Sequence, residues 1–178
     1  RQMCIRDRGV LGSTFILVGV TILYSLTGQL NMARVARIIS IQDISESPAV
    51  ILASASLIGG LALKAAMVPF HAWLPDAHPS APAPISAMLS GVLIKAAGVY
   101  ALARIVFNVL GVSPYYANVL IALGVLSMII GVFLAIGQWD FKRLLAYHSI
   151  SQMGYVVMSI GVAAAVMASG GSKAVASL

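Results

Sequence analysis

Residues 64–104 read KAAMVPFHAWLPDAHPSAPAPISAMLSGVLIKAAGVYALAR, and this stretch decides the fold class. A proline-rich connection, residues 71–84, separates two apolar segments that carry one lysine each. Apolar segments of about 20 residues are typical of helices that cross a bilayer. A lysine near the centre of such a helix costs roughly 2.5–3.5 kcal/mol to insert. Lys64 and Lys95 are therefore the first candidates for a function.

The composition of the whole chain is that of a membrane protein. Of its 178 residues, 60% are hydrophobic and only 9% are charged, whereas a soluble domain has about 25% charged residues. The mean hydropathy of +0.98 exceeds what one small core can hide. The net charge of +6 contains no basic run, so no nucleic-acid partner is expected. One cysteine, Cys4, forms neither an internal disulfide nor a metal cluster, so no cofactor is expected on this chain.

Five segments are long and apolar enough to span a bilayer, namely about 9–30, 49–70, 85–110, 115–138 and 143–168. The sequence therefore predicts an all-α, polytopic transmembrane helical bundle. Ser47 and Ser113 each precede a proline, which is the signal of an N-cap followed by the first helical position. Asp140 is placed to cap the fifth span. Residues 31–47 are amphipathic and predict either a helix on the membrane surface or a solvated loop.

Residues 1–8, RQMCIRDR, hold three arginines and an aspartate beside an apolar segment. We interpret them as an artefactual N-terminal segment. Residues 9–178 are interpreted as one transmembrane domain that is a fragment of a longer protein.

Both lysines follow small residues at helical spacing. Small residues mark the packing face of a membrane helix, so both ammonium groups are predicted to point into the protein. The alternative is a lysine that snorkels to the headgroups. Because no acidic residue lies inside the five spans, each lysine either pairs with a carboxylate elsewhere or exchanges between charged and neutral forms. The two faces are Ser56, Gly60 and Lys64, and Ala87, Gly91, Lys95 and Gly98.

The helix that carries Lys64 has the composition of a broken helix. Gly59 and Gly60 are expected to loosen it before the lysine, and Pro69 cannot donate to the carbonyl of Ala65. Irregular backbone at membrane depth is tolerated where it lines a hydrated cavity, and broken helices often mark transport sites.

The fifth span carries a polar stripe, which must face protein or water in a membrane. Histidine titrates near neutral pH and can pass protons, so it is the strongest candidate of this stripe. A hydrogen-bonded packing stripe is the alternative for the other members. The stripe consists of His148, Gln152, Tyr155 and Ser159.

Two further groups of residues are given simpler interpretations. The fourth span has a face of small residues, Gly124, Ser127 and Gly131, which predicts helix packing alone. Histidines and an aspartate in the connection 71–84 resemble metal ligands, but they lie in a proline-rich interfacial loop, and no metal is predicted. Trp73 in this loop is a plausible interface anchor.

Three stretches carry a resemblance to a known family: residues 64–104, TGQLNMA at 27–33 and DFKRLLAYHSISQMGY at 140–155. They resemble the antiporter-like membrane subunits of respiratory complex I, of membrane-bound hydrogenases of the formate hydrogenlyase type, and of multisubunit Mrp-type cation/proton antiporters. The resemblance implies a fold of about fourteen helices with two inverted repeats, of which this chain covers the sixth to the tenth. It also implies that residues 71–84 and 139–142 face the same side, the cytoplasm.

The resemblance implies roles for individual residues. Lys64 corresponds to the proton-transfer lysine of the discontinuous helix, Lys95 to the connecting lysine and His148 to the next carrier. The family glutamate that pairs with the first lysine, and a further lysine, have no counterpart in this chain. Supporting polar or helix-breaking positions are Gly60, Pro69, Gln152, Tyr155 and Ser159, and the motif loop comprises His71, Trp73, Pro75, Asp76 and His78.

The function that the resemblance implies is proton translocation by an antiporter-like subunit of a redox-driven complex, of the NADH:quinone oxidoreductase or hydrogenase type. The alternatives are a subunit of a Na+/H+ antiporter without a redox partner and a structural membrane anchor. The expected partners are the lipid bilayer, other membrane subunits, protons and, in the antiporter alternative, Na+. The expected location is the inner cell membrane, and no redox active site is expected on this chain.

Overall fold

The computed structural model describes residues 2–42, 47–93, 95–111 and 113–169, and of these it describes residues 2–8, 42, 89, 93 and 95 by their backbone alone. Every element in this part of the chain is helical, which confirms the predicted fold class. The α-helices are α1 (Gln2–Thr27), α2 (Met32–Gln42), α3 (Pro48–Lys64), α4 (Leu74–Ser80), α5 (Ala83–Met88), α6 (Ala101–Ile105), α7 (Pro114–Ile136) and α8 (Phe141–Ala168). Short 3-10 and π-helical turns are η1 (Phe70–Trp73), η2 (Leu89–Leu93), η3 (Lys95–Tyr100) and η4 (Val106–Leu110).

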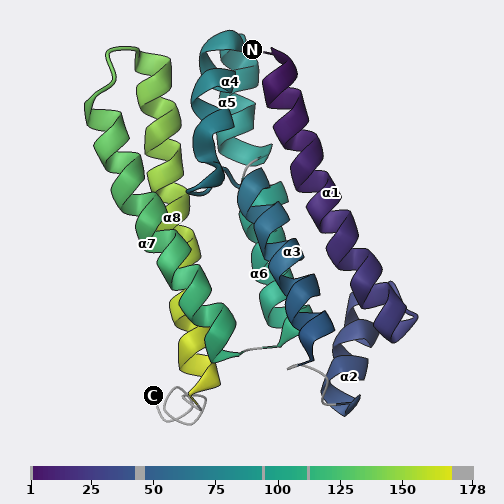
Figure 1. Cartoon of the computed structure of the whole chain (residues 1–178). Coiled ribbons are helices and arrows are strands. Elements are labelled where there is room, and N and C mark those ends of the chain that lie inside the picture. Colours follow the sequence, from purple (N-terminus) through teal and green to yellow (C-terminus); the bar gives the residue numbers. More distant parts are fainter. Residues whose placement is uncertain (1, 43–46, 94, 112, 170–178) are drawn as a thin grey trace.

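The helices form an elongated bundle built from two pairs (Figure 1). Helices α7 and α8 form one pair and α1 and α3 form the other. Residues 83–110, from α5 to η4, run along the bundle, with α6 behind α3 in the view of Figure 1. Helices α4 and α2 lie at opposite ends of the bundle.

Small residues bring α7 and α8 into close contact. A Cβ built at Gly124 would lie 2.9 Å from the carbonyl oxygen of Gly154, and a Cβ at Gly154 would lie 2.7 Å from that of Gly124. Gly131 makes an equally close approach to the backbone of Ser151. The predicted packing role of Gly124 and Gly131 is therefore confirmed, because only residues without a Cβ allow this separation.

Glycines also set the separation of α1 and α3. A Cβ at Gly60 would lie 2.8 Å from the carbonyl oxygen of Gly12, and one at Gly19 would lie 2.6 Å from the side chain of Leu57. Gly59 and Gly60 both lie within regular α-helix, so the expectation that they loosen α3 is wrong. Gly60 instead serves helix packing, which stabilises this part of α3.

Within the residues that the structure describes, four helical segments are long and apolar enough to cross a membrane: Gly9–Thr27, Ala83–Leu110, Pro114–Ile136 and Phe141–Ala168. The predicted span 49–70 is shorter in the structure, because α3 ends at Lys64 after 17 residues. At its start, Ser47 is the N-cap and accepts a hydrogen bond from the N–H of Val50 at 3.3 Å. Ser113 and Asp140 occupy the other two predicted N-cap positions without a side-chain cap bond.

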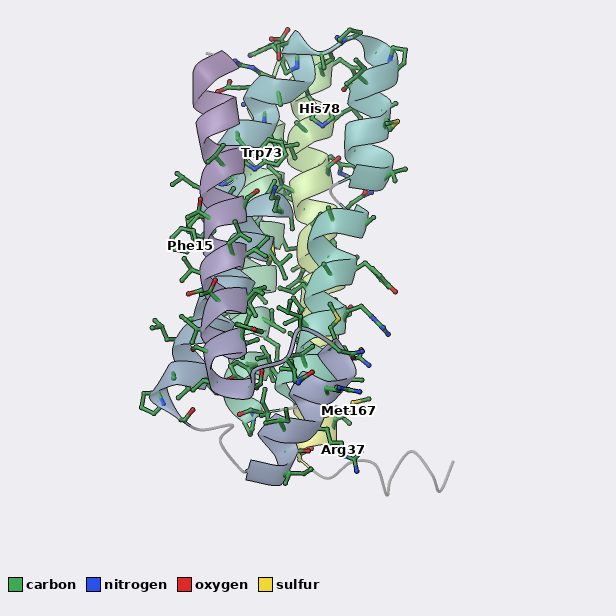
Figure 2. All side chains as sticks on the ribbon, turned by 90° about the vertical axis from the view of Figure 1, so that its right-hand side faces the viewer. Phe15, Arg37, Trp73, His78 and Met167 are labelled. Carbon is green, nitrogen blue, oxygen red and sulfur yellow. The ribbon has the colours of Figure 1, made fainter. Side chains whose placement is uncertain are left out.

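The amphipathic segment 31–47 contains a helix, α2. Its apolar side chains Val35 and Ile39 are buried against Leu23, Ala53 and Leu57 of α1 and α3. Arg37 is exposed, and Figure 2 shows it at the lower end of the molecule, far from His78. The choice of helix over loop is thus decided, while its contact with a membrane surface stays a prediction.

Candidate functional site

The backbone leaves the helical path directly after Lys64. The N–H of Ala66 donates to the carbonyl of Leu63 at 3.2 Å, and the N–H of Met67 donates to the carbonyl of Ala62 at 2.9 Å. Ala66 has a φ of +53°, in the left-handed region. This pair of bonds around a left-handed residue is the Schellman arrangement that terminates helices. Lys64 is therefore the last residue of a helix that ends within the apolar segment, which corrects the expectation of a helix reaching residue 70.

The next turn folds back over this helix end. The Val68–Pro69 peptide bond is cis, and residues Phe70–Trp73 form the turn η1. The indole Nε1–H of Trp73 donates to the carbonyl of Leu63 at 3.0 Å. The tryptophan that the sequence suggested as an interface anchor thus binds the carbonyl next to Lys64, and Figure 2 shows it in the upper half of the bundle.

A second helix supplies one more hydrogen bond to residues 65–69, the non-helical segment after Lys64, which we call the break. The N–H of Val68 donates to Oγ of Ser127 in α7 at 3.0 Å. Ser127 is fully buried and its own hydroxyl donates to the carbonyl of Leu123 at 2.7 Å. The sequence predicted only a packing role for Ser127. A serine within a stripe of small residues was the signal that could have suggested a hydrogen-bonding role as well.

The helix of Lys95 packs against the same break. Gly98 is buried, and a Cβ there would lie 2.7 Å from both Cα and Cβ of Ala65, the residue after Lys64. Lys95 begins the π-helical turn η3 three residues earlier, and its side chain lies outside the described residues. The structure therefore places the backbone that carries Lys95 beside the end of the helix that carries Lys64.

The side chain of Lys64 is half-buried. Among the described side chains, the one ion pair joins Arg143 and Asp76 at 3.5 Å, so no described carboxylate pairs with Lys64.

His148 lies in a groove between α8 and the segment formed by α5 and η2, and both apolar and polar side chains line it. The groove has a volume of about 600 Å³. Oγ of Ser90 and Oγ of Ser149 are 2.8 Å apart across it, and Nε2 of Gln152 is 3.1 Å from Nε2 of His148 along it. His78, Ser86 and Lys142 line the end of the groove nearest to α4. Of the two serines that join the helices, Ser90 was not identified from the sequence, although it shares a face with Ser86 at a spacing of four residues.

The polar stripe of α8 does not form the buried packing face of that helix. His148, Gln152, Tyr155 and Ser159 are exposed in the described part of the chain, while Ala146, Ile150, Met153, Gly154 and Val157 are buried. Ser159 donates to the carbonyl of Tyr155 at 2.9 Å, within its own helix. The groove holds His148 and Gln152 but neither Tyr155 nor Ser159.

Residues of the motif loop tie α4 to the start of α8. Asp76 accepts the ion pair from Arg143, and Nζ of Lys142 donates to the carbonyl of Ala81 at 3.1 Å. The ring of His71 lies 6.5 Å from that of Tyr147. Pro75 is buried in the first turn of α4 and Pro69 is exposed. These contacts bring residues 71–84 and 139–142 to the same end of the bundle, as the resemblance implied.

His78 is the most buried titratable group of this loop, with 3% of its surface exposed. Its Nδ1 is 2.5 Å from Oγ of Ser86, and its Nε2 is buried without a hydrogen-bond partner among the described residues. Burial lowers the pKa of His78, and the neighbouring Lys142 ammonium lowers it further. Within the described ranges, no group of three or more His, Cys, Asp or Glu side chains is arranged to hold a metal ion.

Comparisons with known proteins agree with this geometry. NADH-quinone oxidoreductase subunit N of Desulforudis audaxviator is 39% identical over 157 residues, which cover 86% of this chain and 31% of the relative. A Na(+)/H(+) antiporter subunit of Alkalihalophilus pseudofirmus is 36% identical over 154 residues, with 86% and 31% covered. A chain of the Mrp complex from Dietzia sp. DQ12-45-1b superposes with a TM-score of 0.79 at 34% identity, over 87% of this chain and 28% of that one.

The chain thus spans about a third of the length of the curated relatives that it matches. Residues 8–174 match the family described as NADH:quinone oxidoreductase/Mrp antiporter, TM. This match covers both lysines, the break after Lys64 and the groove of His148. The chain belongs to the NADH:quinone oxidoreductase/Mrp antiporter transmembrane family.

Proposed function

We propose that this chain is the central part of a subunit that moves protons across a membrane. The observation that carries the proposal is the end of α3 at Lys64 within an apolar segment. The surrounding backbone is held by Trp73, Gly98 and Ser127, whereas the ammonium group is half-buried and unpaired by any described carboxylate. A fixed backbone with a side chain that can change partners is what a proton carrier needs.

Lys64 is proposed as the switching group, Lys95 as the lateral relay and His148 as the next carrier. The close contact of Gly98 with Ala65 supports transfer between the first two helices. Ala87 and Gly91 line the groove of His148, and Lys95 follows Gly91 by four residues on the same helical segment. Polar side chains in this groove can order water and extend the path, because a water needs two to four polar partners.

The driving force is proposed to be electron transfer in a partner subunit of a redox complex. The 39% identical relative is a subunit of an NADH-quinone oxidoreductase, which supports this choice. Exchange for Na+ is the second candidate, favoured by the relative that is a Na(+)/H(+) antiporter subunit and by the likeness to the Mrp complex. In both cases we propose that the redox active site, where there is one, lies on another subunit, and that other membrane subunits are the partners of this chain.

Proton uptake into vesicles that contain the full-length parent complex tests the proposal. Lys64→Ala is compared with wild type and with Arg37→Ala, since Arg37 is exposed at the lower end of the molecule in Figure 2, far from the groove of His148. We expect Lys64→Ala to abolish uptake in an assembled complex while Arg37→Ala retains it. Undiminished uptake in assembled Lys64→Ala would make the chain a structural anchor.

The same vesicles separate the two driving forces. An electron donor for the complex, supplied without Na+, should energise uptake in the redox case. An imposed Na+ gradient without any electron donor should do so in the antiporter case.

A further inference from the structure

The break after Lys64 has one backbone donor that its own segment cannot satisfy. The N–H groups of Ala65, Ala66 and Met67 all donate to carbonyls of α3, and that of Phe70 donates to Met67. Pro69 has no N–H. Only the N–H of Val68 reaches another helix, and its acceptor is Ser127. Since an unpaired buried N–H is costly, this acceptor fixes the position of the break.

The hydroxyl of Ser127 is oriented for this task. It donates its proton to the carbonyl of Leu123, so a lone pair of Oγ remains for Val68. The side chain is 0% exposed, which keeps water from replacing either bond. Many serines in membrane helices make only the bond to their own helix. Ser54 is an example in this chain, because it is 1% exposed and donates only to the carbonyl of Ile51.

We propose that Ser127 is a positioning residue for the proton carrier Lys64, acting through the N–H of Val68. This proposal rests on the proposed function. The bond joins α7, which is packed along its length on α8, to the five-residue segment 65–69 that follows Lys64. It therefore sets where the end of α3 sits relative to α8, the helix that carries His148.

Helix packing alone does not account for a serine at this position. Its neighbours in the stripe, Gly124 and Gly131, approach the backbone of α8. An alanine would serve packing equally well, because it has nearly the volume of serine. The difference between the two residues is the acceptor that Val68 uses, and this difference can be measured.

The experiment compares Ser127→Ala, Ser127→Thr and the matched control Ser54→Ala in the full-length parent complex. Two readouts are used: hydrogen exchange of the Val68 amide and the pH profile of proton uptake. Ser127→Ala should speed exchange and lower uptake about three- to tenfold, with the pH midpoint moved by roughly half a unit or more, as expected for one lost buried hydrogen bond. Ser127→Thr, which keeps the acceptor, should restore both readouts, and Ser54→Ala should change neither.

Each other outcome is informative. An unchanged pH profile in assembled Ser127→Ala, with faster exchange at Val68, would overturn the positioning role. Equal effects in Ser54→Ala would also overturn it, because the cause would then be the loss of any buried hydroxyl. If Ser127→Ala does not assemble, Ser127→Cys keeps the volume with a weaker acceptor, and an unaltered profile in that variant refutes the proposal. Failure of the proposed function is recognised separately, by full uptake in Lys64→Ala.

Discussion

Gly98 lies directly against Ala65, so close that a Cβ on the glycine would come within 2.7 Å of both Cα and Cβ of the alanine. Ala65 follows Lys64, and Gly98 follows Lys95 by three residues. The contact therefore couples the backbones of the two lysine-bearing segments. Movement of one segment has to displace the other, since neither backbone can yield at this distance.

Replacing Gly98 should disrupt this contact. Gly98→Ala introduces the overlapping Cβ, and overpacking of this kind costs about 1–3 kcal/mol. Gly91→Ala is the matched control, because nothing lies within 4 Å of a Cβ at Gly91 on the same helical segment. Thermal denaturation of the purified parent complex should show a lower midpoint for Gly98→Ala alone. Identical midpoints for the two variants would contradict the close approach.

Removing the indole donor should weaken the end of α3. Trp73→Phe keeps the aromatic ring but loses the bond to the carbonyl of Leu63, which should cost about 1 kcal/mol. Trp139→Phe should have no effect, because Trp139 is fully exposed. Equilibrium unfolding of the detergent-solubilised parent complex, followed by far-UV circular dichroism, measures both. A loss of stability in Trp139→Phe as large as in Trp73→Phe would argue against the bond.

The stability of variants at position 66 should depend on how well the new residue tolerates a left-handed backbone conformation. At a φ of +53° a Cβ is unfavourable by roughly 1–2 kcal/mol. Ala66→Gly removes that strain together with one buried methyl group, worth about 0.8 kcal/mol, so its stability should stay within about 1 kcal/mol of wild type. Ala66→Val should be far more destabilising, because a β-branched residue is an outlier at positive φ. Yield of assembled complex and its melting midpoint report the difference, and a wild-type yield for Ala66→Val would refute it.

Acidification should weaken the packing around His78. Its pKa in the folded protein is lowered by burial and then by Lys142, so the unfolded chain binds more protons below the ordinary histidine pKa of about 6.5. Stability therefore rises with pH through this region, and it falls as the pH drops below about 6.5 toward the folded pKa.

An NMR titration of labelled histidine measures this pKa. Lys142→Gln should raise the pKa of His78 toward its ordinary value. Arg143→Gln is the control, because Arg143 is paired with Asp76 and does not act on His78. Equal shifts in the two variants would show that the cation was assigned wrongly.

The sequence predicted the helical segments well because apolar runs and caps are local signals. The Ser47-Pro48 pair marks the start of α3, and the small-residue face of α7 marks its contact with α8. The end of α3 was misplaced by six residues relative to the predicted span 49–70. Pro69 indicated a break in this segment, but Ala66 adopts a left-handed conformation that usually requires glycine, so the position of the stop at Lys64 had no signal in the sequence.

The same contrast between local sequence signals and tertiary contacts applies to the candidate site. Lys64, Lys95 and His148 stood out because charged and titratable residues are rare in apolar segments. The residues that hold the backbone around Lys64 did not stand out in the sequence. Ser127 and Ser54 are both serines in apolar helices, and only the packing of α7 on the break gives one of them a bond to Val68. Likewise, Gly91 and Gly98 share one helical segment, but only Gly98 meets another backbone.

The sequence by itself determined that this chain is a helical membrane domain with two lysines in apolar segments, because hydropathy and residue type depend on no neighbour. The tertiary structure alone decided that α3 stops at Lys64, that Trp73 and Ser127 bind the break, and that Gly98 closes on Ala65. These features depend on contacts between residues that are distant in the chain, and periodicity along one helix carries no information about which partner it meets.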